Sequence, residues 1–492
     1  MRFLLMVFCC IPFFIKGQQF ELKVNGGYGS GFYNAGDTIH VWAREEKLIE
    51  TFKTWSGDTL YVDDPGEWHA RLFMPAKNIM ITAQFKNLPA GAKLTFERLK
   101  GRDTLKPVQY YFPSEGNKMK GLVWIFHGSG GNFNSFTGQV EGVSIIKSLI
   151  ANDYAVAISE CDEATFHTDF NQDGNARWEY PVINGTNRDM ENHALFQDIF
   201  IARGYMEANL PQFGVGFSAG GSFAISNGWL MNFVKAITFC APGLNVIREN
   251  STMPTQWFMS LLDNHPEVGK EGNDTALINF NRFRERGICA QFNMFLPSPC
   301  YPDYFRRIPG VDSIKSLALF NELKAMTVLN ARNYFRLYPD QIKLAVLANP
   351  GKYPALISLT PSQLQEMDNL IIVLFAGHHP HSHFNAKMIR FFDEDCENIT
   401  TGNREANIHP AFSLFPNPAR EKVNIILPAI PDQKLKGKLY DISGRCVQDV
   451  HFTATGADIL QLNLSFMKAG VYALSLRGDR GYFQSQKLSV IR

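Results

Sequence analysis

The feature that most restricts the fold of this chain is a glycine-rich segment directly after an apolar run. The run Phe213–Phe217 leads into Ser218, which is followed by Ala219 and two further glycines. A serine between Gly216 and Gly220 is typical of a tight turn from a strand into a helix, because only glycine leaves room around that turn. Such a turn exposes the serine hydroxyl at the positive end of the helix. The segment predicts that Ser218 is a nucleophile; a tight turn without a chemical role is the alternative.

A second glycine-rich segment lies upstream of this serine. The apolar run Gly121–Phe126 leads into His127–Asn132, which contains three glycines. Glycine lets the backbone N–H groups of such a loop turn toward a carbonyl oxygen. We expect the N–H groups of Ser129 and Ala219 to form an oxyanion hole, and the ring of His127 to hold the loop. A plain flexible turn is the alternative, and the loop lacks the lysine of a P-loop.

The general base should follow the serine in the chain, after the last strand of a sheet. We predict that strand at Leu370–Phe375, and four histidines come soon after it: His378, His379, His381 and His383. Any of the four is a candidate base at this point. A metal site built from the cluster is the rival interpretation, but no acidic residue at ligand spacing supports it. We therefore expect no metal.

An acidic residue that orients the base should lie between the serine and the histidines. The run Thr255–Leu262 predicts a strand that ends at Asp263, whose carboxylate would accept the histidine ring N–H and stabilise the imidazolium. Asp340 and Asp368 are alternatives, because the long segment Gly287–Asp368 separates Asp263 from the expected last strand. We interpret that segment as an insertion near the mouth of the site. The alternative for Asp263 is a purely structural role, in which its side chain caps a loop.

Strand and helix patterns alternate between Pro89 and Asp395, which predicts an α/β fold: a mostly parallel sheet with helices on both faces. The remaining expected strands are Ala155–Ser159 and Val234–Cys240. The expected helices are Val143–Asn152, Asp189–Ala208, Gly220–Met231 and Phe384–Asp393.

The order of the serine turn, the glycine-rich loop and the histidine cluster resembles the α/β-hydrolase superfamily. The segments H-G-S-G-G-N and G-F-S-A-G-G are similar to its esterase and polyhydroxybutyrate-depolymerase-like branch. This resemblance implies His378 as the base, because the base of the superfamily often follows that strand directly. It also implies ester hydrolysis through Ser218, His378 and Asp263 without a cofactor, on polysaccharide-linked or polymeric esters. A serine peptidase or acyl transferase on the same fold, or an inactive surface adhesin, is the alternative.

The chain begins with a segment typical of export. Arg2 precedes a short apolar run that ends at Gly17, as in a secretory signal peptide, and the run is too short for a transmembrane helix. An exported chain can form disulfides, and Cys289 and Cys300 are the expected pair. The formal net charge of +1, without a run of one sign, argues against a nucleic-acid surface.

Two short all-β segments are expected to flank the central one, at residues 18–88 and 411–492, the second after a polar linker at 396–410. The first resembles the divergent internalin-type B-repeat, and its Trp42, Trp55 and Phe73 are expected in the core. The second contains Phe415–Ala419, Leu439–Arg445, Ala469–Leu476 and Gln486–Arg492. With these blocks it resembles the C-terminal sorting domain of type IX secretion substrates of the Bacteroidota. This implies the type IX machinery as a partner, and passage through the periplasm and outer membrane to the cell surface or the medium.

One further pattern, Asp169–Gly174, reads D-x-N-x-D-G, the opening of a calcium-binding loop. The glutamate that would close such a loop is replaced by Tyr180. The segment therefore predicts a polar turn.

Overall fold

The computed structural model describes residues 18–114, 119–180, 187–395 and 412–491, the last range without 416, 418, 427–432, 442–445, 455–458, 466 and 479–482. The expected signal peptide and the linker at 396–410 lie outside the described residues. The described residues fall into two compact units, one within residues 18–44 and 52–86 and the other within residues 45–51 and 87–491.

The first unit is all-β, as predicted. One sheet has the order β3-β1-β7-β5 and a second has the order β2-β4-β6. Trp42 and Trp55 are buried, as expected, but Phe73 at the end of β6 is 48% exposed, so its expected place in the core is wrong. The strands are β1 (Gln19–Asn25), β2 (Gly27–Tyr28), β3 (Gly31–Asn34), β4 (Thr38–Ala43), β5 (Glu50–Gly57), β6 (His69–Phe73) and β7 (Ile79–Asn87).

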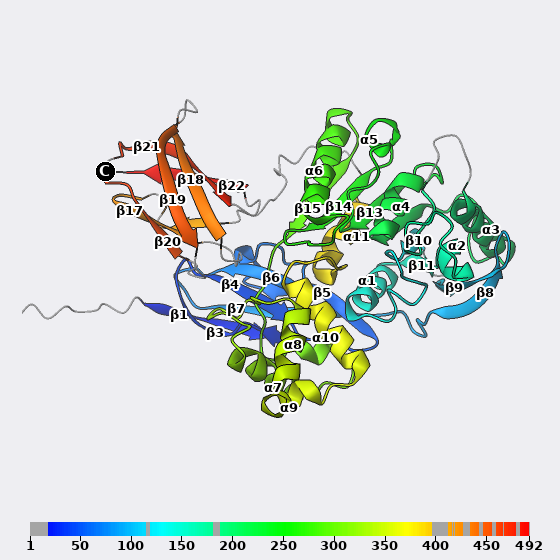
Figure 1. The fold of residues 1–492 in the computed structure, drawn as a ribbon, viewed down its shortest axis with the longest axis horizontal. Coiled ribbons are helices and arrows are strands. Elements are labelled where there is room, and N and C mark those ends of the chain that lie inside the picture. Colours follow the sequence, from blue (N-terminus) through cyan, green and yellow to red (C-terminus); the bar gives the residue numbers. More distant parts are fainter. Residues whose placement is uncertain are drawn as a thin grey trace, which may run out of the picture. The chain divides into compact units, whose positions relative to one another are not determined.

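The central region contains an eight-stranded sheet with the order β15-β14-β13-β12-β10-β11-β9-β8 (Figure 1). Neighbouring strands from β15 to β11 are parallel, while β8 and β9 form an antiparallel hairpin at one edge. This confirms the predicted mostly parallel sheet. The strands are β8 (Thr95–Lys100), β9 (Leu105–Tyr111), β10 (Gly121–Phe126), β11 (Tyr154–Ile158), β12 (Gln212–Phe217), β13 (Lys235–Phe239), β14 (Thr255–Ser260) and β15 (Ala290–Phe295).

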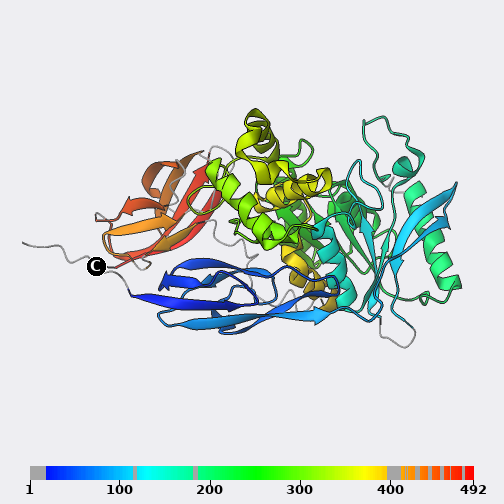
Figure 2. The same cartoon turned by 90° about the horizontal axis from the view of Figure 1, so that it is seen from below.

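Helices cover both faces of this sheet, because its strands are apolar on both sides. Leu122, Trp124 and Phe126 of β10 belong to a core with α3 (Arg188–Ala202), α4 (Ala219–Asn227) and α6 (Gly269–Glu285). The intervening Val123 and Ile125 face a second core with α1 (Val140–Ala151) and α11 (Asn385–Asp393). In Figure 2, α1 and α3 lie on opposite sides of the sheet. With this strand order and the serine turn described below, the region has the α/β-hydrolase fold.

The predicted strand Leu370–Phe375 is wrong, because most of it is the end of α10 (Pro361–Leu374). Thr360 and Gln363 cap this helix reciprocally, with Pro361 at its first position. The last strand is instead β15, which alternates buried and less buried residues as an edge strand does. After β15 the chain leaves the sheet and forms α7 (Ser313–Ala325), α8 (Pro339–Ala348), α9 (Pro354–Ile357) and α10 before the histidine cluster (Figure 1).

The expected disulfide between Cys289 and Cys300 is also wrong. Cys289 is packed in the core shared with α1 and α11, whereas the Cys300 thiol is buried and donates to the Tyr301 carbonyl. The two side chains therefore belong to different packing environments.

The described part of residues 412–491 is all-β, as predicted. Sheets with the orders β16-β17-β20 and β19-β18-β21-β22 enclose a core that includes Val423, Leu439 and Leu474. No helix among the described residues is long and apolar enough to cross a membrane. The strands are β16 (Ser413–Phe415), β17 (Lys422–Ile426), β18 (Gln433–Asp441), β19 (Cys446–Ala454), β20 (Ile459–Asn463), β21 (Gly470–Gly478) and β22 (Phe483–Val490).

Candidate active site

Ser218 lies on a sharp turn between β12 and α4. Its backbone has φ 53° and ψ −122°, a conformation that costs energy for any residue with a Cβ. The Ser218 N–H donates to the carbonyl of Phe239 on the neighbouring strand, and the Ser218 carbonyl accepts from Ser222 in the first turn of the helix. Both sides of the turn are thus held by hydrogen bonds in a strained geometry that is typical of a nucleophile elbow.

The glycines around this turn are required by contact with other backbone atoms. A Cβ added to Gly216 would lie 2.1 Å from the carbonyl oxygen of Gly220. A Cβ added to Gly220 would lie 2.2 Å from the carbonyl oxygen of His127. The turn therefore packs directly against the glycine-rich loop, which explains why the two segments occur together.

The glycine-rich loop lies beside Ser218 and is held by His127. A Cβ added to Gly128 would lie 3.2 Å from the Ser218 Cβ. The His127 Nδ1–H donates to the Gly128 carbonyl at 2.7 Å, and its Nε2 accepts from the Cys161 N–H at 3.2 Å. Burial lowers the pKa of His127 to about 4, so the ring is neutral. This confirms the structural role expected for His127, whose hydrogen bonds hold the loop beside the serine turn.

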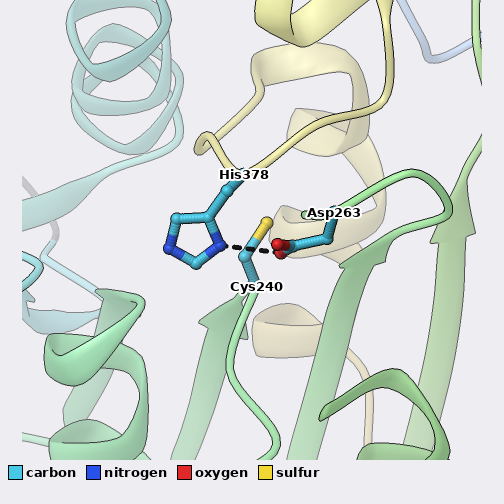
Figure 3. Close-up of side chains that lie close together, drawn as sticks. All are labelled: Cys240, Asp263 and His378. Atoms are coloured by element: carbon cyan, nitrogen blue, oxygen red, sulfur yellow. Dashed lines mark hydrogen bonds and ion pairs between the residues drawn. The ribbon is translucent and has the colours of Figure 1, made fainter. Parts of the chain in front are cut away.

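His378 and Asp263 form a hydrogen bond of 2.7 Å between Nδ1 and Oδ2 (Figure 3). The Asp263 side chain, three residues after the end of β14, is fully buried, and the His378 side chain is 12% exposed. The ring of His378 also packs against that of Phe217, the residue before Ser218, with ring centroids 4.8 Å apart. This contact places the His378 ring beside the serine turn, and among the described residues no hydrogen bond joins it to Ser218.

The other three histidines of the cluster are buried and turned to other partners. His379 donates from Nδ1 to the Pro380 carbonyl, and Nε2 of His381 lies 3.2 Å from the Ser260 hydroxyl. The ring of His383 packs on Phe295 at 4.7 Å. Burial lowers the pKa of His379, and that of His381 to about 3. His378, in contrast, is bonded to the Asp263 carboxylate.

The two alternative acids lie elsewhere in the inserted helices. Asp340 is exposed in the first turn of α8. Asp368, on α10, pairs with Lys343 at 2.5 Å. Asp263, in contrast, is hydrogen-bonded to His378 of the histidine cluster.

A metal-binding alternative remains in the same place, because Cys240, Asp263 and His378 bring ligand atoms within 4.8 Å of one another. Cys240 is fully buried, and its thiol lies 3.3 Å from the Ser260 hydroxyl. Burial, and then the Asp263 charge, raises the pKa of Cys240 to about 12. The thiol is therefore protonated at neutral pH, which makes it a poor ligand. The 2.7 Å Asp263–His378 hydrogen bond has the geometry of a carboxylate that orients a histidine.

Two neighbours of this pair were missed by the sequence analysis. The ring of His265 stacks on that of His378, with centroids 4.4 Å apart and planes at 23°. Tyr338, at the start of α8, lies against Gly377, since a Cβ there would be 2.2 Å from its hydroxyl oxygen. His265 follows the acid by two residues, which was the available signal; nothing in the local sequence points to Tyr338.

The Asp169–Gly174 segment forms the predicted polar turn. The Asp169 carboxylate accepts from the N–H groups of Asp173 and Gly174, and Asn171 accepts from Asp173. Arg177, just after this turn, pairs with both oxygens of Glu267.

Comparisons with known proteins identify the C-terminal segment. Residues 413–491 match the secretion system C-terminal sorting domain. A search of curated proteins finds no match.

Solved structures with partial similarity include three esterases or hydrolases. Esterase Est22 is 13% identical, with 42% of this chain and 72% of that chain covered and a TM-score of 0.30. A thermostable esterase is 13% identical, with 57% and 91% covered and a TM-score of 0.30. S-formylglutathione hydrolase FrmB from Staphylococcus aureus is 10% identical, with 41% and 91% covered and a TM-score of 0.30. Scores of this size carry no argument, so the fold assignment rests on the strand order and the serine turn.

The chain thus combines a central region of α/β-hydrolase fold with a C-terminal sorting domain, and it is exported to the cell surface or the medium.

Proposed function

We propose that this chain is a serine esterase that uses Ser218, His378 and Asp263. The observation that carries the proposal is the 2.7 Å bond between a buried carboxylate and a histidine whose ring packs beside the strained serine turn. Asp263 accepts a hydrogen bond from the His378 Nδ1–H, which leaves the opposite ring nitrogen, Nε2, to take the proton of Ser218.

The reaction follows in two steps. The Ser218 oxygen attacks the ester carbonyl carbon while its proton passes to His378. The N–H groups of Ala219 and Ser129 stabilise the resulting oxyanion. His378 then protonates the departing alcohol, and water hydrolyses the acyl-enzyme by the same route. Asp263 stabilises the imidazolium in both steps.

Export favours a substrate outside the cell. We propose a polysaccharide-linked or polymeric ester, in keeping with the likeness of the two glycine-rich segments to polyhydroxybutyrate-depolymerase-like esterases. We also propose that the N-terminal unit is a B-repeat-like domain of the kind found on bacterial surface proteins.

A fluorophosphonate probe tests the proposal directly, because it labels only an activated serine. The parent protein should be labelled and should hydrolyse short p-nitrophenyl esters, and Ser218→Ala should do neither. Absence of label on the parent would favour an inactive adhesin. Cleavage of peptide amides in preference to esters would favour a peptidase, and acyl transfer to an added alcohol would favour a transferase. Feruloyl and polyester substrates then separate the ester classes.

A further inference from the structure

His265 contacts both members of the Asp263–His378 pair. Its backbone N–H donates to Asp263 Oδ1 at 2.9 Å, while Asp263 Oδ2 is bonded to His378. Its ring stacks on the His378 ring, nearly parallel and 4.4 Å away. One residue therefore limits the rotation of the carboxylate and covers one face of the imidazole.

The His265 ring is held in its neutral form. Its Nδ1 accepts from the Glu267 N–H at 3.3 Å, so any ring proton of the neutral form is on Nε2. Burial, and then the nearby charge of His378, lowers the pKa of His265; Arg177 acts in the same direction, whereas Glu267 and Asp263 oppose it. A neutral aromatic ring can stack on an imidazolium without charge repulsion.

The loop that carries His265 is braced from the other side. Glu267 binds the Arg177 guanidinium through both oxygens, at 2.9 and 2.5 Å. The Arg177 Nε lies 2.9 Å from Asp173 of the polar turn. The turn that resembles a calcium loop thus positions the arginine that holds the His265 loop.

We propose that His265 is a positioning residue, whose flat ring holds the His378 imidazole in the orientation that proton transfer with Ser218 requires. This inference rests on the proposed esterase function and adds a residue to it. The ring supplies shape and a neutral face, and it does not exchange protons with the substrate.

Substitutions that separate ring shape from ring nitrogen test this. Both His265→Ala and His265→Leu remove the flat ring, and both keep the backbone N–H bonded to Asp263. We expect either to lower kcat about 10- to 100-fold, the cost of a misplaced catalytic group. KM should stay within about 2-fold, since no substrate contact is lost. His265→Phe keeps a flat neutral ring and should recover most of kcat.

Two controls accompany these variants. His167→Asn replaces an exposed histidine at φ 50°, a conformation that asparagine tolerates, and should leave kcat unchanged. Thermal unfolding of each variant distinguishes a misplaced imidazole from an unfolded protein, and His265→Leu serves where His265→Ala does not fold.

A second readout does not depend on esterase activity. The low-field proton resonance of the His378 Nδ1–H reports its bond to Asp263, and His378→Ala assigns the signal. It should broaden or vanish in His265→Ala and persist in His265→Phe. Unchanged kcat and an unchanged resonance in folded His265→Ala would overturn the proposal, as would a His265→Phe variant as impaired as His265→Ala. If the parent protein takes no fluorophosphonate label, the proposed function fails, and the resonance alone decides the role of His265.

Discussion

At the scale of single residues, the proposed role of the Asp263 carboxylate leads to the sharpest prediction. Its fully buried side chain accepts from His378, so Asp263→Asn would present an amide where an acceptor is needed and favour the wrong tautomer. We expect kcat to fall about 10³- to 10⁴-fold, with little change in fold. Steady-state kinetics on a p-nitrophenyl ester would measure the loss.

The two alternative acids supply matched controls for that experiment. Asp340→Asn changes an exposed helix residue, and Asp368→Asn weakens an ion pair with Lys343. Both should keep kcat within about 3-fold of the parent. A large loss of kcat in either variant, with Asp263→Asn active, would transfer the role of the acid to that residue.

The glycine at position 220 provides a second prediction at this scale. A Cβ there would meet the carbonyl oxygens of His127 and Phe126 at 2.2 and 2.4 Å, so Gly220→Ala must separate the serine turn from the oxyanion loop. We expect kcat to fall by at least about 100-fold, since the oxyanion donors move with the loop. Gly351→Ala, where no atom lies within 4 Å of an added Cβ, is the control and should leave kcat unchanged. Equal activity of the two variants would contradict the tight packing.

The sequence predicts much of the candidate site because the nucleophile, the acid and the base of such a site occur in a fixed order along the chain. Ser218, Asp263 and His378 each follow a strand or a glycine signal, and the required order excluded most other candidates. His265 and Tyr338 were missed because their contacts depend on the path of a loop and on the docking of an inserted helix. No local period in the sequence encodes either.

At the scale of elements, the apolar run at Leu370–Phe375 shows that hydrophobic pattern alone cannot distinguish a short strand from a buried helix end. Short buried runs of leucine and β-branched residues fit a strand and a buried helix end equally well. The sequence signal that favours a helix lies upstream, in the reciprocal cap that Thr360 and Gln363 form at the start of α10. The edge strand β15 was missed because polar residues, Gln291 and Asn293, interrupt its apolar run, whereas a central strand such as β10 is continuously apolar.

A buried ion pair connects the inserted segment Gly287–Asp368 to α1. Arg307 lies 2.5 Å from Glu141, whose other oxygen accepts from the Ser382 N–H beside the histidine cluster. Arg307→Met would leave the Glu141 carboxylate buried and unpaired, which costs about 3–5 kcal/mol of unfolding free energy. Urea unfolding would measure this loss. The double variant Arg307→Met with Glu141→Gln also removes the buried negative charge, and it should regain most of the lost unfolding free energy. If the double variant is no more stable than Arg307→Met, the two residues do not act as a pair.

At the scale of the whole molecule, residues 413–491 match a sorting domain, so we expect export to depend on them. A chain that ends before residue 412 should accumulate within the cell envelope and retain fluorophosphonate labelling, because its proposed catalytic residues all lie in the central region. Immunoblots of the medium, cell surface and periplasm would locate both forms. Equal amounts of the full and shortened chains in the medium would contradict the role of this domain.

Buried histidines make the stability of the central region depend on pH. Burial lowers the pKa of His127, His193 and His381 to about 4, 3 and 3. The unfolded chain takes up protons at these residues below pH about 6.5 while the folded one does not, so their contribution is lost as pH falls toward 4. Burial raises the pKa of Asp189 to about 7, so as pH falls the folded chain takes up this proton before the unfolded chain does. The contribution of Asp189 to the unfolding free energy therefore rises as pH falls, and it offsets the loss from one of the three histidines.

His193→Phe isolates one of these contributions. The His193 ring packs on Trp124 at 3.9 Å and lies 5.2 Å from Phe126, so a phenyl ring can occupy its place without titrating. Between pH 6 and 4 the unfolding free energy of the parent should fall more steeply than that of the variant, by about 1.4 kcal/mol per pH unit. Urea unfolding at pH 6, 5 and 4 measures both slopes. Parallel slopes would mean that His193 already takes up a proton in the folded protein, against its burial.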